Sequence, residues 1–193
     1  MKIKRRDYLS WSQLNAWEKN PNIYYEMYVM GMETPFTKWM KKGKDLAEYL
    51  EKGTGDDEDI KQVADFIPRY KESEFEIRAK LENINLLGYL DSFDPDNLNI
   101  YEYKTGKKYT QGMANKLGQL DFYALMVWLK YKKLPNSIKL IWIETETIDD
   151  EVKFTGKIKT FEVKKTMEDI IKIIGRIHKA KKEIEAMWET VDL

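Results

Sequence analysis

Two apolar runs joined by a short polar turn place the strongest constraint on what this chain can fold into. Residues 85–93 and 97–104 alternate or run apolar, as strands do in a sheet with a buried face. Between them lies Asp94-Pro-Asp-Asn97, and aspartate, proline and asparagine are favoured in tight turns. The two runs are therefore predicted to pair as an antiparallel β-hairpin.

Helical and strand patterns on both sides of the hairpin predict an α/β architecture. Ser10 and Gln13 fit the capping box that starts a helix, with the serine on free amides and the glutamine reaching back. An apolar stripe at helical spacing predicts a long C-terminal helix over 166–188. The other elements are expected as helices at 37–51, 60–70 and 115–131 and as strands at 75–81, 137–144 and 153–163. This order favours a mixed sheet flanked by helices.

The length of 193 residues suits one domain. We expect a single unit over 1–193, with N-terminal helices in 8–70, the core that carries the site in about 37–163, and the last helix in 165–189. The acidic, glycine-containing segment Gly53–Asp59 is expected to be a solvated turn within it.

Composition excludes several kinds of function. Lysine plus arginine and aspartate plus glutamate both count 33, so bulk positive charge cannot hold a partner. The absence of cysteine excludes disulfides, thiolate zinc sites, iron–sulfur clusters and cysteine nucleophiles. The single histidine, His178, excludes sites that need two imidazoles and is expected to be structural. No stretch approaches the ~18 apolar residues of a membrane span, so we expect an intracellular protein with no membrane partner.

The hairpin carries the side chains that are able to bind a cation or take part in catalysis. With Asp94–Asn97 as its loop, Asp91 faces Ile100, and Glu102 is the diagonal neighbour of Asp91 on the same side of the sheet. Diagonal neighbours have Cα atoms ~7–8 Å apart, close enough for two carboxylates to share one cation. Lys104 projects from that same face, because strand side chains repeat every two residues. Two acids and a lysine are thus predicted to converge.

Burial of these acids is costly unless something compensates. Mg²⁺ or Mn²⁺ would do so, because hard cations prefer carboxylate and carbonyl oxygens. A lysine beside such an ion can orient a water molecule or stabilise charge on a phosphate. The alternative is a surface Glu–Lys pair beside an acidic turn, which is common in a chain that is 34% charged.

The segment after the hairpin favours a phosphate-bearing partner. Gln119 and Tyr123 lie four residues apart and so share one helix face, from which they can hydrogen-bond phosphates without reading bases. Trp11 and Trp39 lie outside the predicted sheet and are candidates for stacking on single strands. The segment also carries three lysines and no acid before Gly118, and such a basic loop would hold phosphates: Lys107, Lys108 and Lys116. The alternative is that this loop is only solvated.

Three ordered motifs resemble the RecB-like exonuclease branch of the PD-(D/E)XK nuclease superfamily. They are Gly88-Tyr-Leu-Asp91, Tyr101-Glu-Tyr-Lys-Thr-Gly106 and Gln119-Leu-Asp-Phe-Tyr123. Leu9–Leu14 is similar to the opening helix of that branch, and Lys42-Gly43 to its first motif. The resemblance covers roughly residues 8–145 and implies a restriction-endonuclease-like core, a central mixed β-sheet flanked by helices.

The resemblance also implies a function and a set of site residues. The function is that of a Mg²⁺- or Mn²⁺-dependent DNA nuclease, an exonuclease acting in recombination, repair or phage DNA processing in a prokaryotic or phage setting. Its partners would be single- or double-stranded DNA and, beyond DNA, a second copy of the chain or a repair protein. Asp91, Glu102 and the Tyr103 carbonyl would hold the metal, Lys104 would be the catalytic lysine, and Gln119 and Tyr123 would line the DNA path.

Two departures from the family pattern leave alternatives open. The branch usually has a histidine ligand four residues after the first-motif glycine, and that position is Ala47 here. Its neighbour Glu48 is the expected substitute, ahead of Asp45 and Glu51. If this ligand is lost, the protein is a catalytically inactive nucleic-acid-binding or regulatory module. A small-molecule enzyme with an acidic metal site is a third reading. Relatives that hold an iron–sulfur cluster use cysteines, which this chain lacks.

Overall fold

A six-stranded mixed sheet forms the centre of the molecule in the computed structural model, which describes residues 5–33, 35–70 and 72–191. The strand order is β1-β3-β4-β5-β6. Strands β1 and β4 pair with different parts of one edge of β3, and β2 pairs along its other edge. Pairing is parallel for β1–β3 and β4–β5 and antiparallel for the rest. The strands are β1 (Leu9–Ser10), β2 (Glu72–Leu81), β3 (Ile84–Asp94), β4 (Asn99–Gly106), β5 (Ser137–Ile148) and β6 (Glu151–Val163).

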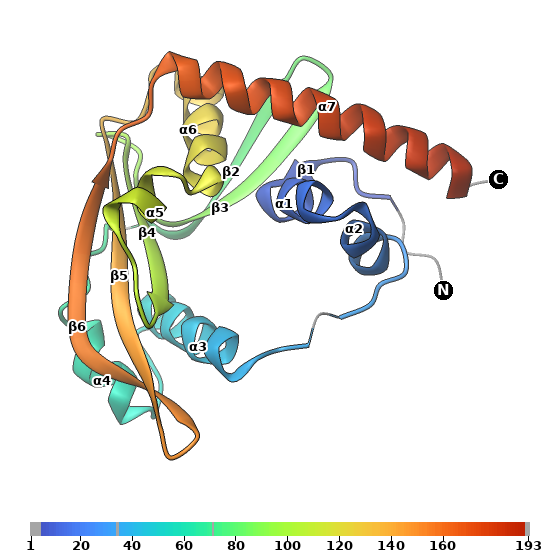
Figure 1. The fold of residues 1–193 in the computed structure, drawn as a ribbon. Coiled ribbons are helices and arrows are strands. Elements are labelled where there is room, and N and C mark those ends of the chain that lie inside the picture. Colours follow the sequence, from blue (N-terminus) through green and yellow to red (C-terminus); the bar gives the residue numbers. More distant parts are fainter. Residues whose placement is uncertain (1–4, 34, 71, 192–193) are drawn as a thin grey trace.

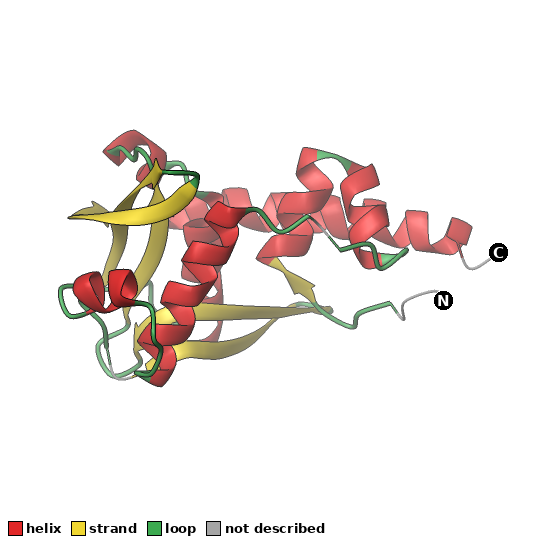
Figure 2. Ribbon diagram, turned by 90° about the horizontal axis from the view of Figure 1, so that it is seen from below, coloured by secondary structure: helices red, strands yellow, loops and turns green. Residues whose placement is uncertain are grey.

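Helices cover both faces of this sheet (Figures 1 and 2). One buried cluster joins β2 and β3 to α1, α2, α6 and α7, and a second joins β5 and β6 to α3 and α4. No helix in the described ranges has the length and apolar character needed to cross a membrane. The predicted fold class is confirmed. The helices are α1 (Trp11–Lys19), α2 (Pro21–Tyr28), α3 (Lys38–Lys52), α4 (Glu58–Ala64), α5 (Gln111–Asn115), α6 (Gly118–Tyr131) and α7 (Met167–Val191).

Polar side chains fix where the helices begin. Ser10 is the N-cap of α1 and its Oγ accepts a hydrogen bond from the amide of Gln13 at 3.4 Å, as predicted. The second half of the capping box differs: the Gln13 side-chain amide donates to Ser10 Oγ and to the Tyr8 carbonyl, whereas a capping box would have its oxygen accept from the Ser10 backbone amide. Thr37 caps α3 in the same way, with its Oγ1 accepting from the Met40 amide.

The segment Gly53–Asp59 is more structured than a solvated turn. Asp57 caps α4 by accepting hydrogen bonds from the amides of Asp59 and Ile60. Both aspartates also bind the Lys42 ammonium, at 2.9 and 2.7 Å, and Asp59 accepts from the Phe154 amide of β6. The segment thus ties α3, α4 and β6 together. The helix expected at 60–70 accordingly starts at this cap and ends at Ala64.

The helix expected at 115–131 is divided into α5 and α6. Thr110 Oγ1 caps α5, and α6 begins at Gly118 without a side-chain cap. Helix α6 packs tightly at this start, since a Cβ on Gly118 would lie 2.6 Å from the Trp11 ring. Trp11 therefore supports the junction and also packs against Phe122, with ring centroids 6.4 Å apart.

The hairpin register differs from the predicted one by two residues. Asp94 Oδ1 accepts hydrogen bonds from the amides of Asp96 and Asn97, so the turn closes one residue later and Leu98 takes a positive φ of 53°. Phe93 then pairs with Ile100. Asp91 consequently lies opposite Glu102, one step beyond the last ladder pair, rather than opposite Ile100. A shift of two preserves the face on which each side chain lies.

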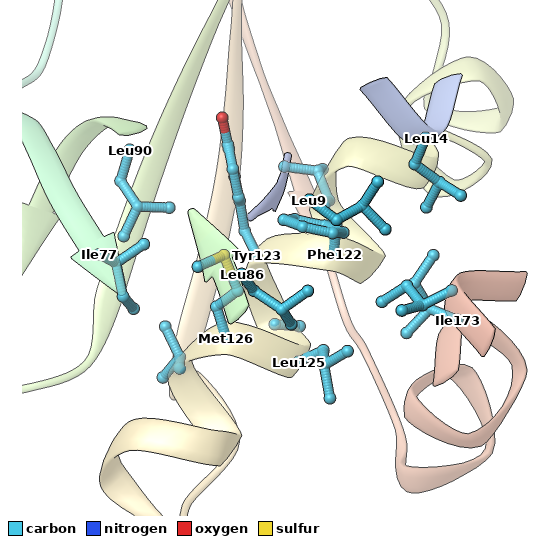
Figure 3. Packing of buried hydrophobic residues seen from close by; sticks show 14 of the residues in the cluster. Leu9, Leu14, Ile77, Leu86, Leu90, Phe122, Tyr123, Leu125, Met126 and Ile173 are labelled. Carbon is cyan, nitrogen blue, oxygen red and sulfur yellow. The ribbon is translucent and has the colours of Figure 1, made fainter. Parts of the chain in front are cut away.

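Helix α6 is buried on nearly all sides, and Figure 3 shows its residues within the main core. The Tyr123 side chain, predicted to share a phosphate-binding face with Gln119, is only 5% exposed, and Met126 beside it is 0% exposed. The close approach of α6 to β3 depends on Gly88, where a Cβ would lie 3.0 Å from Met126 Sδ and 3.1 Å from Tyr123 Cε1. Gly88 thereby allows α6 to lie against the strand that carries Asp91.

Candidate active site

The candidate site lies where β3 and β4 separate. Their ladder ends at the pair Ser92 and Tyr101, while β4 continues alongside β5 as far as Gly106. At the point of separation the Asp91 carboxylate takes the place of a backbone acceptor, because its Oδ2 accepts a hydrogen bond from the Tyr103 amide at 2.7 Å. This bond fixes Asp91 beside the strand that carries Glu102 and Lys104.

A chain of hydrogen bonds then orients the lysine. Lys104 Nζ donates to Glu102 Oε1 at 2.6 Å and to Gln119 Oε1 at 3.0 Å. The Gln119 amide donates in turn to the Tyr123 hydroxyl at 3.0 Å. Gln119 and Tyr123 therefore position the ammonium group. Tyr123 was predicted to line the DNA path. In the structure it is buried and its hydroxyl accepts a hydrogen bond from Gln119 instead.

The buried setting shifts the protonation equilibria of the three ionisable groups. Burial, followed by the nearby Asp91 carboxylate, raises the pKa of Glu102 to about 8 against the pull of the Lys104 ammonium. Burial also raises the pKa of Asp91, opposed by Lys104 and by the Tyr103 amide. Burial works against the ammonium, but Glu102 and Asp91 outweigh it and raise the pKa of Lys104. Lys104 thus remains cationic at neutral pH.

The acids fit a hard divalent cation. Glu102 is 0% exposed, and its Oε2 has no hydrogen-bond partner although it is buried. An unpartnered buried carboxylate oxygen costs free energy that a cation would recover. Within the described ranges, however, no three histidine, aspartate or glutamate side chains lie close enough together to hold a metal. Asp91 and Glu102 would therefore supply two acidic ligands to such an ion, and a third acid would have to move toward them.

Glu74 on β2 is the acid best placed for such a movement, and the motifs did not point to it. It lies between the ladder pairs Ser73–Ser92 and Phe75–Leu90 and so faces Asp91 across the sheet. Its backbone has a positive φ of 47°, an uncommon conformation for glutamate. Burial, followed by the charge of Asp91, raises the pKa of its carboxyl group to about 7. Only the β2–β3 pairing reveals this proximity, because Glu74 precedes the strand predicted from residue 75.

The three catalytic candidates open into a cavity of about 600 Å³. Asp91, Glu102 and Lys104 line one side of it, and α3 with the residues just before it forms the other. Gly43 lets α3 approach β4, since a Cβ there would lie 3.1 Å from Thr105 Oγ1. The glycine of the first motif thus has a packing role at the cavity wall.

The structure does not bring Glu48 into this cavity. Ala47 lines the cavity, whereas the Glu48 side chain is 47% exposed and its carboxylate lies 3.5 Å from the Lys44 ammonium and 3.9 Å from that of Lys52. The lesser candidates Asp45 and Glu51 do not line it either. Helix α3 therefore presents an alanine where the resemblance led us to expect a metal ligand.

The lysines that follow the hairpin lie at the surface, and one of them lies beside the cavity. Lys107, Lys108 and Lys116 are all exposed. Lys107 stands over the ring of Trp39, with its Nζ 5.2 Å from the centroid, and Trp39 lines the cavity. His178 lies far along α7, with its Nε2 3.8 Å from a Glu82 carboxylate oxygen. The structure thus places Lys107 near the site and leaves His178 outside it.

A mixed sheet with two acids and a lysine at the separation of two strands defines the class of nuclease-like α/β proteins. The model of one family, described as the PD-(D/E)XK nuclease superfamily, matches residues 16–189. The chain belongs to this superfamily, whose members are hydrolases of nucleic acids that generally use divalent metal ions. No curated protein sequence matches this chain significantly.

Solved structures share the same fold. A candidate exonuclease from Eubacterium rectale has 11% sequence identity and a TM-score of 0.61, and the match covers 94% of this chain and 80% of that one. A phage-related exonuclease from Haemophilus somnus has 14% identity and a TM-score of 0.50, with 93% of this chain and 82% of that one covered. At such low identity these matches establish the architecture.

Proposed function

We propose that this protein is a Mg²⁺- or Mn²⁺-dependent deoxyribonuclease, an exonuclease with an intracellular role in recombination, repair or phage DNA processing. The observation that carries the proposal is that Asp91, Glu102 and Lys104 share one cavity, in which Glu102 Oε2 is buried without a partner. Membership of a nuclease superfamily and a fold shared with exonuclease structures support it.

Each site residue would have a distinct role in phosphodiester hydrolysis. Asp91, Glu102 and the Tyr103 carbonyl would hold the ion, which supplies charge neutralisation at the phosphate and a more acidic water. Lys104, held by Gln119, places a positive charge beside the attacking water and the scissile phosphate. Lys107, Lys108 and Lys116 would contact flanking phosphates of the DNA. Water attack at phosphorus breaks the P–O bond, and the leaving oxygen takes up a proton.

One observation favours a second candidate, a nucleic-acid-binding module without activity. Glu48 points away from the cavity, and the described residues gather no three acids in the geometry of a metal site. Such a module would bind DNA but take up no metal. Calorimetry of the wild-type protein with Mn²⁺ separates the two candidates, because only the nuclease needs to bind the ion.

Digestion of end-labelled DNA tests the proposed activity. We expect wild-type protein with Mg²⁺ or Mn²⁺ to degrade linear DNA and leave circular DNA intact, with single- and double-stranded forms compared in parallel. Asp91→Ala and Lys104→Ala should each lower the rate about a hundredfold or more, because each removes a group that acts on the phosphate. The control is Lys172→Ala, an exposed residue of α7. Cleavage by Asp91→Ala at the wild-type rate would refute the assignment.

Assembly is a separate prediction. Association with a second copy or with a repair protein would enclose the DNA more fully than one chain does. Light scattering after size-exclusion chromatography, with and without a DNA duplex, measures whether the wild-type protein is a monomer or an oligomer.

A further inference from the structure

Three large apolar side chains stand at the rim of the catalytic cavity instead of in the core. Phe36 and Met40 are 59% and 47% exposed, and together with Trp39 they line the wall opposite the acids. None of the three belongs to the buried clusters of the described residues. Exposed apolar side chains gathered around a cavity mark a binding surface.

A second hollow continues from this wall. It has a volume of about 550 Å³ and is lined by Trp39, Met40, Thr105, Gly106 and Lys107. Trp39, Met40 and Thr105 line the catalytic cavity as well, so the two hollows adjoin. Trp39 therefore stands between the site of hydrolysis and a neighbouring space.

Cations flank the aromatic rings of the wall. Lys107 Nζ lies 5.2 Å from the centroid of the Trp39 ring, and Lys44 Nζ lies 5.9 Å from that of Phe36. No acid lines the second hollow. A ligand that suits both the rings and the ammonium groups has planar apolar faces and negative charges, as a nucleotide chain does.

A paired duplex cannot use such a surface fully, because its bases are stacked on one another and only their edges are accessible. An unpaired nucleotide exposes the face of its base. We propose that Trp39 stacks on an unpaired base next to the scissile phosphate while Lys107 contacts the backbone, so that the protein acts on single-stranded DNA or frayed DNA ends. This inference rests on the proposed nuclease function and specifies its substrate class.

Binding without cleavage tests the proposal. Fluorescence anisotropy in EDTA at fixed salt gives the Kd of a labelled single-stranded oligonucleotide and of the matching blunt duplex. We expect Trp39→Ala to weaken single-strand binding about tenfold or more, in line with the loss of one stacked base. Blunt-duplex binding should change less than twofold, and Trp39→Phe should retain most of the single-strand affinity. The matched control is Phe66→Ala, an exposed aromatic residue that lines neither hollow.

The outcomes separate this inference from the proposed function. Single-strand binding by Trp39→Ala at the wild-type level, or equal weakening for single strand and duplex, overturns the inference. Thermal melting identifies any variant that fails to fold, and if Trp39→Ala does so, Trp39→Leu replaces it, because leucine keeps an apolar side chain but offers no aromatic face for stacking. Wild-type protein that binds single strands through Trp39 yet cuts no DNA with metal would refute the nuclease and leave the stacking site standing.

Discussion

At the scale of single residues, the burial of Glu102 couples its protonation to the stability of the fold. Glu102 has a pKa of about 8 in the metal-free folded protein, against an ordinary value of 4.5. Between these values the folded state holds a proton that the unfolded state has lost, so the free energy of unfolding falls as pH rises. The stabilisation is complete below about pH 4.5 and is lost as pH passes 8.

Melting curves in EDTA at pH values from 5 to 9 check this linkage. We expect the Tm of the wild-type protein to fall toward pH 9 more steeply than that of Glu102→Gln, which cannot ionise at this position. Glu76→Gln serves as the control, because Glu76 is exposed and pairs with Arg78. Parallel slopes for wild type and Glu102→Gln would contradict the pKa shift.

Glu74 offers a test at the same scale. If this residue turns toward Asp91 when metal binds, Glu74→Gln should weaken Mn²⁺ binding about tenfold or more, as loss of a supporting group at a metal site does. Glu48→Gln should have little effect, because that side chain points away from the cavity. Isothermal titration calorimetry measures both affinities. A large loss for Glu48→Gln with none for Glu74→Gln would restore the acid of helix α3 as the ligand.

The sequence predicted the proximity of residues within one motif better than the proximity of residues that only folding brings together. Asp91, Glu102 and Lys104 are close in the chain, and two-residue strand periodicity suffices to put the last two on one face. Glu74 meets Asp91 only through the β2–β3 ladder, which no local pattern specifies. Glu48 was assigned as a ligand by analogy to a missing histidine. The structure does not support this assignment, because α3 is oriented so that Ala47, and not Glu48, lines the cavity.

At the scale of elements, the fit of α6 against β3 depends on Gly88. A methyl group at this position would lie 3.0 Å from Met126 Sδ, and Met126 is fully buried. We therefore expect Gly88→Ala to lower the free energy of unfolding by about 1–3 kcal/mol, as overpacking of a core does. Urea denaturation measures this change.

The control for Gly88→Ala is Gly175→Ala. Gly175 lies within α7, and a Cβ there would meet no atom within 4 Å. This change should be neutral or stabilising, because alanine favours helix by about 1 kcal/mol over glycine. A loss at Gly175 equal to that at Gly88 would show that the packing argument is mistaken.

Element positions were easier to predict than their mutual register. The strands and the long helices lie within a few residues of the predicted ranges, since hydrophobic periodicity specifies them. The predicted hairpin register was wrong because the Asp94 carboxylate accepts hydrogen bonds from the amides of Asp96 and Asn97, which moves the turn by one residue. The burial of Tyr123 was not predicted because helix α7 and the strands β2 and β3, which are distant in sequence, all pack against α6.

At the scale of the whole molecule, α7 supports the core from a distance in the sequence. Ile177 is fully buried in the main cluster, which α1 and α6 share. Ile177→Ala should lower the free energy of unfolding by about 2–5 kcal/mol because it leaves a cavity. Ile171→Ala, on the exposed side of the same helix, should change it by less than about 0.5 kcal/mol.

Two measurements check the role of α7. Urea denaturation compares the two isoleucine variants, and calorimetry with Mn²⁺ on the folded Ile177→Ala protein asks whether the distant cavity is disturbed. We expect metal affinity within about twofold of wild type, because the acids are fixed by β3, β4 and α6. A large loss of affinity would show that α7 also shapes the site.

The parallel pairing of β4 with β5, from Asn99–Ser137 to Gly106–Glu144, has a consequence for the time at which the candidate site can form. Every catalytic candidate has been synthesised once Lys104 has left the ribosome. The strand that holds β4 in place follows more than thirty residues later, after the crossover through α5 and α6. A nascent chain would therefore carry Asp91, Glu102 and Lys104 for some time before β5 can align them, and under the proposed function it would not attack nucleic acid near the site of translation.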